Sequence, residues 1–220
     1  KPWLATKTSH RMMPSIPKPV IRRYLPTTIQ ETTRANFSRK KRVCASRSSN
    51  IETNINQPIT FCELGTRDER VFCKAFLPGI LAENAFAVLA DYENFEKINS
   101  SVTRGLIISR DDDTVLAQYL GSMGGYKYQL RVINQEFPAT SDEPTWSINW
   151  KLADSAGFIE VNEGMVRLED TCLEGVAGCQ LELESATKTS LSIVNKLAPP
   201  FLIKMVKSQV EKVFFEAKNR

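Results

Sequence analysis

Histidine is nearly absent from this sequence, which has a single one, His10, among 220 residues. Residues 51–220 contain none, so a Ser-His-Asp or Cys-His nucleophile system of the usual form is excluded there. The five cysteines form no C-x-x-C pair and lack the spacing of zinc ligands. So few cysteines, odd in number, also argue against a disulfide scaffold, and we expect free thiols.

Long apolar runs are absent as well. The longest, such as Leu106-Ile107-Ile108, fall far short of the roughly 18 residues needed to span a bilayer. Apolar residues still make up 42% of the chain, which is enough for one or two domains with a sizeable core. We therefore expect a soluble protein.

Acidic residues are almost missing from the first fifty positions. Residues 1–50 contain one of the 25 acids, Glu31, but 12 of the 29 lysines and arginines. The remaining chain therefore has a net charge of −7, although the whole sequence has a charge of +4. A basic total favours a nucleic-acid partner, but an acidic folded part removes that argument.

The composition of residues 1–50 is typical of an organelle transit peptide, rich in Arg, Lys, Ser and Thr and interrupted by prolines at 14, 17, 19 and 26, among others. The string Val43-Cys44-Ala45 resembles a plastid processing site, which favours a plastid over a mitochondrion. A basic tail that carries no targeting signal is the other interpretation. We expect residues 51–66 to form a linker, with an edge strand over 59–64, and residues 67–220 to form one domain.

The folded part begins with a strand and two short helices. Val71–Leu77 has strand-like residues, and Pro78-Gly79 breaks the pattern. Apolar residues at helical spacing predict a helix over 80–90. Asp91 then caps a second short helix that ends near residue 98, with Tyr92 and Phe95 facing inward.

A period of two replaces the helical period after residue 100 and predicts an antiparallel meander. The predicted strands are 106–109, 115–120, 126–132, 146–152, 164–168 and 180–184. The acidic run 111–113 is interpreted as a turn rather than a metal site. The glycine-rich segment 121–125 is interpreted as a hairpin turn, since it lacks the lysine and the spacing of a phosphate-binding loop.

The C-terminal segment predicts one long helix that starts at Pro199-Pro200, because proline is well tolerated in a first helical turn. An apolar stripe continues from there over about twenty residues, or about 30 Å. Such a stripe requires a wide apolar partner. We therefore predict an α+β fold in which a curved antiparallel sheet of about seven strands wraps around this helix, with a space between them.

Three local strings resemble the START-like superfamily called SRPBCC. The first, Ala87 to Phe95 (AVLADYENF), is similar to the "VLxDYxN" element of its polyketide cyclase/dehydrase and coenzyme Q-binding branch, which includes plastid lipid-transport-like members. The others are Gly157-Phe158 followed by Gly164 and Leu168, and the helix led by Pro199-Pro200. The sequence departs from the family at Met165, where tryptophan is usual. The resemblance implies the helix-grip fold.

The same resemblance implies a cavity for an apolar molecule and no fixed catalytic set. We expect no cofactor and no metal. The predicted cavity residues are Tyr126, Tyr128, Leu130, Trp146, Ile148, Trp150, Phe158, Met165, Leu181, Leu183, Met205 and Val206. Plain core packing is the other interpretation of the aromatic residues. Stacking on single-stranded nucleic acid requires a basic groove, which the charge disfavours.

The first hypothesis is therefore a protein that binds or carries an apolar small molecule, such as a lipid, a prenylquinone or an isoprenoid. This function has no nucleic-acid partner and allows a transient contact with a membrane. The second hypothesis is a cyclase or dehydratase in which a tyrosine or a carboxylate moves a proton. The third is a protein-interaction module whose cavity is filled by side chains.

Overall fold

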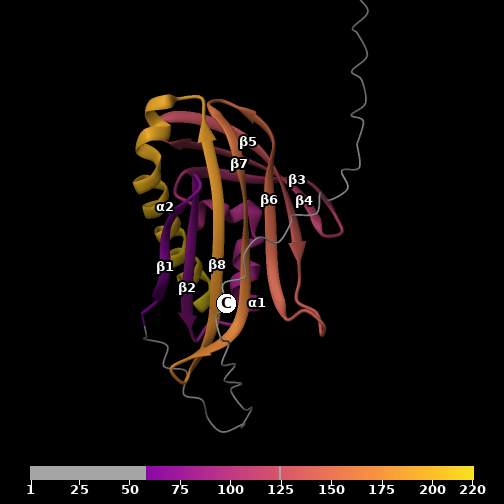
Figure 1. Cartoon of the computed structure of the whole chain (residues 1–220). Coiled ribbons are helices and arrows are strands. Elements are labelled where there is room, and N and C mark those ends of the chain that lie inside the picture. The colour runs from indigo at the N-terminus through magenta and orange to yellow at the C-terminus, as the bar shows by residue number, and fades with distance from the viewer. Residues whose placement is uncertain (1–57, 124) are drawn as a thin grey trace, which may run out of the picture. The chain divides into compact units, whose positions relative to one another are not determined.

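A computed structural model describes residues 58–123 and 125–220, apart from the side chains of residues 192–198. The predicted transit peptide and the first seven residues of the predicted linker, 51–57, lie outside this description. Within it, an eight-stranded sheet carries helices on one side (Figure 1). The strands are β1 (Thr60–Arg67), β2 (Arg70–Pro78), β3 (Val102–Asp111), β4 (Thr114–Met123), β5 (Tyr126–Phe137), β6 (Thr145–Ala156), β7 (Ile159–Leu173) and β8 (Val176–Thr189). The helices are α1 (Ala82–Leu89), the 3-10 helix η1 (Tyr92–Lys97) and α2 (Ser192–Lys218).

The strand order is β1-β2-β8-β7-β6-β5-β4-β3, and each neighbouring pair in the described sheet is antiparallel. Strands β3 to β8 therefore form the predicted meander, while β2 adds to its far edge. Strand β1 lies where the sequence predicted a linker with an edge strand, and it brings the strand count from about seven to eight. The turn between β3 and β4 includes Asp112 at a φ of 46°, a conformation that aspartate tolerates in turns.

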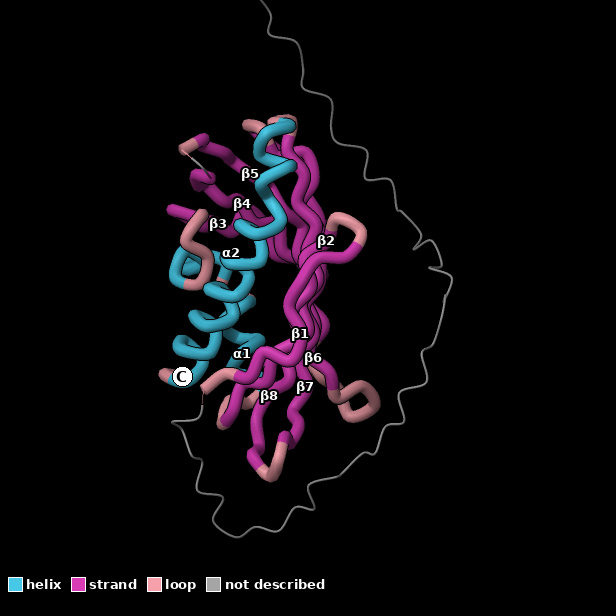
Figure 2. Tube along the Cα trace, turned by 60° about the vertical axis from the view of Figure 1, so that its left-hand side comes forward, coloured by secondary structure: helices cyan, strands magenta, loops and turns pink. Residues whose placement is uncertain are grey.

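Both α-helices pack on the same face of the sheet, which Figure 2 shows from the side. Helix α2 begins at Ser192 and contains Pro199 and Pro200 in its interior, so the predicted start at Pro199 is wrong by seven residues. A proline inside a helix removes a hydrogen bond and bends the axis, but the helix can continue on both sides of it. Among the described residues, no helix has both the length and the hydrophobicity needed to cross a membrane.

The buried apolar side chains divide into two clusters. The first joins β2, β8 and the middle of β6 and β7 to α1 and α2, and its centre includes Leu77, Leu168 and Val210. The second joins β3, β4 and β5 to η1, and its centre includes Tyr92 and Val115. Trp150 is only partly buried and packs against both clusters. Packing is therefore expected to be least complete between the two clusters.

Candidate functional site

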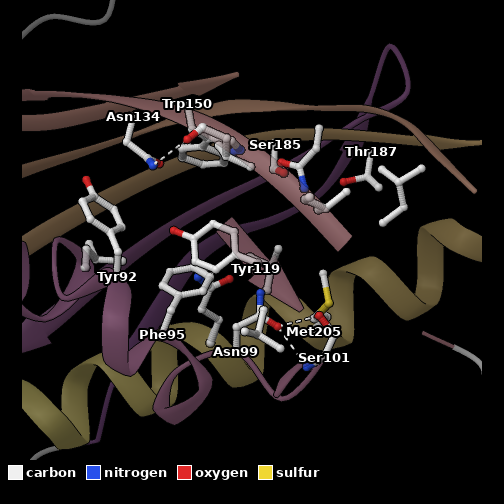
Figure 3. Close-up of a pocket in the computed structure, with 18 of the residues that line it drawn as sticks. Tyr92, Phe95, Asn99, Ser101, Tyr119, Asn134, Trp150, Ser185, Thr187 and Met205 are labelled. Atoms are coloured by element: carbon white, nitrogen blue, oxygen red, sulfur yellow. Dashed lines mark hydrogen bonds between the residues drawn. The ribbon is translucent and has the colours of Figure 1, made fainter. Parts of the chain in front are cut away.

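A cavity of about 120 Å³ lies between the sheet, η1 and α2 (Figure 3). Its walls take side chains from both core clusters, including Ile148 and Leu183 from the first and Leu130 and Val132 from the second. The two clusters fill their own halves of the interior and leave this space where they meet. Its volume is close to that of an engineered cavity of about 150 Å³ that binds benzene.

Two glycines allow the walls to approach each other. A Cβ atom at Gly105 of β3 would collide with the backbone carbonyl oxygen of Tyr92, so this strand passes directly against η1. A Cβ atom at Gly164 of β7 would collide with the indole of Trp150 and the backbone of Glu184. The missing side chain at Gly164 therefore makes room for the ring of Trp150, which lines the cavity.

The lining residues are apolar, aromatic or neutral and polar. No Asp, Glu, Lys, Arg or His is among the described side chains that line the cavity. The described part of the chain also contains no group of three or more His, Cys, Asp or Glu residues placed to bind a metal ion. An ionised ligand group would find no counter-charge in this space, and burying an unpaired charge is very costly.

One group of polar side chains in the lining is bonded within the protein. The Tyr128 hydroxyl donates to the Ser101 carbonyl oxygen at 3.0 Å and lies 2.9 Å from Ser101 Oγ. Ser101 Oγ in turn donates to Asn99 Oδ1 at 2.8 Å. Burial raises the pKa of Tyr128, and the hydrogen bond with Ser101 offsets part of that rise. These contacts join β5 to the segment between η1 and β3.

A second polar group, at the η1 end of the cavity, is less completely bonded. It consists of Tyr92, Tyr119 and Asn134, which are all buried. The amide of Asn134 donates to the carbonyl oxygens of Val115 and Val132 at 3.4 Å each, near the limit for a hydrogen bond. Burial raises the pKa of Tyr119, and a hydrogen bond with Asn134 offsets part of the rise.

Burial also raises the pKa of Tyr92, and the neighbouring Glu136 carboxylate raises it further. The hydroxyl of Tyr92 nevertheless has no hydrogen-bond partner in the described structure. Both tyrosines therefore remain protonated at neutral pH and can donate a hydrogen bond, but neither is suited to act as a general base.

Seven of the twelve predicted cavity residues line this space: Tyr128, Leu130, Ile148, Trp150, Leu183, Met205 and Val206. The other five do not. Tyr126 is 55% exposed at the start of β5, and Phe158 packs edge-on against Tyr126 and Tyr128. Trp146 and Leu181 belong to the first core cluster, where the Trp146 ring lies 4.8 Å from that of Phe86.

Met165 was expected inside the cavity, and the structure places it elsewhere. It pairs with Asn149 and Glu184, and the next residue, Val166, lines the cavity. Since successive side chains of a strand point to opposite faces, Met165 lies on the outer face of the sheet. Asp91 does occupy the cap position of η1, but it caps no backbone N–H; its carboxylate accepts from Asn94 and pairs with Arg220 at 2.9 Å.

The sequence analysis missed several polar residues of the lining, among them Tyr119, Asn134, Ser185 and Thr187. A signal for some of them was present in the alternation. Asn134 continues the buried series of Tyr128, Leu130 and Val132 at every second position of β5. A polar residue at an inward position of a strand indicates a buried polar group that needs a partner.

Similar folds occur among solved structures. The model matches human STARD10 with a TM-score of 0.55 at 12% identity, covering 76% of this chain and 74% of that one. It matches a STAR-related lipid transfer protein from Xanthomonas axonopodis (TM-score 0.53, 8% identity, 73% and 98% covered). It also matches the Zhui aromatase/cyclase from Streptomyces sp. R1128 (TM-score 0.51, 15% identity, 69% and 94% covered).

The chain has the START-like, helix-grip fold. No protein-family model and no curated protein sequence matches it. The predicted fold class is thereby confirmed, with one strand more than expected. The cavity lies between the inner face of the sheet and the C-terminal helix.

Proposed function

We propose that this protein binds and carries an apolar small molecule, such as a lipid, a prenylquinone or an isoprenoid, in the cavity beneath α2. The observation that carries the proposal is a cavity with mainly apolar and aromatic walls and no charged side chain among its described residues. Apolar burial at about 25 cal/mol per Å² supplies the binding free energy. Lipid transfer by a protein of the same fold is compatible with this function.

The cavity volume of about 120 Å³ is smaller than the roughly 300–1,000 Å³ of typical ligand sites. A whole lipid or quinone therefore requires α2 and η1 to move apart, and the part of it that first enters is about one ring in size. Two features suit α2 to such a movement. It contacts the sheet through one face, and it contains two adjacent prolines.

A cyclase or dehydratase is the second candidate, and one observation favours it: Tyr92 lines the cavity, and its buried hydroxyl has no regular hydrogen-bond partner in the described structure. The Zhui aromatase/cyclase shares the fold. However, the described lining contains no carboxylate or histidine to act as a base, and the raised pKa of Tyr92 suits it only to donate a proton. The binding function therefore accounts for more of the site.

Purification of the full chain under native conditions, followed by mass spectrometry of bound lipids, tests the proposal. We expect a stoichiometric apolar ligand after incubation with an extract of plastid lipids and quinones. Met205→Trp fills the cavity and should abolish this binding. Phe201→Trp is the matched control, since Phe201 lies on the same helix but is 47% exposed. A wild-type protein that binds no compound of the extract would refute the carrier function.

The proposed function includes a location in the cell. Residues 1–50 direct the chain to a plastid, where it contacts a membrane transiently to collect or deliver its ligand and has no nucleic-acid partner. The basic, proline-interrupted composition of these residues supports the targeting role. A fluorescent protein fused to residues 1–50 should enter plastids, and uptake by mitochondria instead would contradict this assignment.

A further inference from the structure

The Tyr92 hydroxyl is a buried donor without an acceptor. The residue is 2% exposed, and its hydroxyl has no hydrogen-bond partner in the described structure. The backbone of Tyr92 is held in place, because Gly105 of β3 packs directly against its carbonyl oxygen. A buried polar group left without a partner costs about 1–3 kcal/mol, so a position of this kind calls for an explanation.

Glu136 is the candidate partner within the protein, because its carboxylate raises the pKa of Tyr92 both through its charge and as a hydrogen-bond acceptor. Its Oε2 accepts from Arg110 Nη1 at 3.1 Å, whereas its Oε1 is buried and has no partner. The contact falls outside the limits of a regular hydrogen bond, so the Tyr92 hydroxyl and Glu136 Oε1 satisfy each other incompletely. Glu136 does not line the cavity, whereas Tyr92 does.

Two further neutral polar groups lie at the same end of the cavity. Figure 3 shows the hydroxyls of Tyr92 and Tyr119 and the amide of Asn134 together at that end, with Phe95 and Trp150 beside them. Asn134 is 4% exposed, and both of its hydrogen bonds to backbone are long. Three neutral groups that can donate, in a space without charge, match the oxygen of an uncharged ligand.

The aromatic side chains add a preference for shape. Trp150 is the cross-strand partner of Asn134, and the rings of Phe95 and Tyr119 are 5.0 Å apart and tilted by 37°. A flat ring in the cavity would contact these side chains on both sides while its oxygen faced Asn134 and Tyr92. Aromatic contacts of this kind contribute beyond the area that they bury.

We propose that Tyr92, Tyr119 and Asn134 form a subsite for the hydroxyl or carbonyl oxygen of an uncharged, ring-containing ligand. This inference rests on the proposed binding function and specifies its ligand class. Free fatty acids and phospholipid headgroups are excluded from the subsite, since their charge would be buried without a partner. Quinones, sterols and cyclic isoprenoids with a keto or hydroxyl group remain.

Three small probes test the subsite, and their size suits a cavity of about 120 Å³. Toluene, phenol and benzoate share one ring and differ in carrying no oxygen, a neutral hydroxyl or a charged carboxylate. Their dissociation constants are measured by NMR titration of the full chain, in the wild type and in Tyr92→Phe and Tyr126→Phe. Tyr126→Phe is the matched control for binding, because Tyr126 is 55% exposed and does not line the cavity. Tyr128→Phe is the reference for stability, because the Tyr128 hydroxyl is bonded to Ser101.

We expect Tyr92→Phe to weaken phenol binding about five- to tenfold and to leave toluene binding unchanged. Tyr126→Phe should change neither by more than about twofold, and benzoate should bind at least about tenfold more weakly than phenol. The unfolding midpoint of the empty protein should not fall in Tyr92→Phe, because no hydrogen bond is lost. It should fall in Tyr128→Phe.

Other results would overturn the inference. If Tyr92→Phe changes phenol and toluene binding equally, or changes neither, the subsite is wrong although the cavity binds apolar molecules. If Tyr92→Phe lowers the unfolding midpoint as Tyr128→Phe does, the hydroxyl is already bonded inside the protein and is not available to a ligand. If none of the three probes binds to the wild type, the binding function fails together with the subsite.

Discussion

Gly105 offers a direct test of how the cavity is built, because it is the point where β3 contacts the backbone of η1. Replacing it with alanine adds one methyl group, whose carbon would overlap the carbonyl oxygen of Tyr92 and lie 3.0 Å from its carbonyl carbon. Both obstacles are backbone atoms, so no rotation of a side chain can relieve them. Either β3 or η1 must shift, and Tyr92 moves with η1.

Inserting one methyl group into a well-packed interior costs about 1–3 kcal/mol. The smaller unfolded-state entropy of alanine returns less than about 1 kcal/mol of this. We therefore expect Gly105→Ala to lower the free energy of unfolding by about 2 kcal/mol. In a domain of this size that corresponds to a fall in melting temperature of about 4–8 °C.

Thermal and urea unfolding measure the change, and Gly65→Ala is the matched control. Gly65 is also a strand glycine, but a Cβ atom there would meet only the ring of Phe72, at 3.1 Å, which can move aside. Its variant should stay within about 0.5 kcal/mol of the wild type. If Gly105→Ala were as stable as Gly65→Ala, the close contact between β3 and η1 would not fix the position of Tyr92.

Two further predictions concern buried groups. Asp170→Ala should lower the free energy of unfolding in urea by about 1 kcal/mol. Asp170 Oδ1 accepts the N–H of Ala82 at 2.7 Å, and the residue at the cap position of α1 provides no side-chain acceptor. An unchanged unfolding midpoint would contradict this. Burial raises the pKa of Cys73 to about 11 and that of Cys179 to about 12, and it raises that of Tyr92 as well. These groups fold in the protonated form, so their contribution to stability is complete below about pH 8 and is lost as the pH rises past the unfolded values of about 8.5 for thiols and 10 for tyrosine. Urea unfolding between about pH 7 and pH 11 measures this, and a stability that increased over that range would refute it.

The element order could be predicted from the sequence because each element has a clear local pattern. The alternation of Tyr128, Leu130 and Val132 predicts a half-buried strand, and the alanine-rich segment before Asp91 predicts a short helix. The strand lengths were underestimated. Strand β7 has 15 residues, while only five were predicted, because its polar residues continue the strand through partners on other strands, as Glu163 does with Arg70 of β2 at 2.6 Å. A pattern of apolar residues alone cannot reveal such partners.

The candidate site was predicted less completely than the fold. Trp146 and Trp150 do share the inner face of β6, as the alternation indicated. Four residues of strand separate them by about 14 Å, however, and over that distance the core passes from one cluster to the other. Trp146 therefore packs under α1, and Trp150 lines the cavity. The position of a side chain along a strand matters as much as its face, and it depends on which helix crosses there.

The cavity itself follows from the way the two clusters are completed. The first cluster is closed by α1 and by the buried stripe of α2, and the second is closed by η1 with Tyr92 at its centre. Each helix lies over its own part of one continuous curved sheet, and between the two clusters Met205 and Val206 of α2 face the sheet across the space that remains. Trp150 is too small to fill the gap, and the polar groups of Tyr92 and Asn134 at its edge need partners that the apolar walls do not supply. A space with these walls and these unmatched groups is complementary to an apolar molecule with one neutral polar end, which is why a ligand and not further packing is expected to complete the interior.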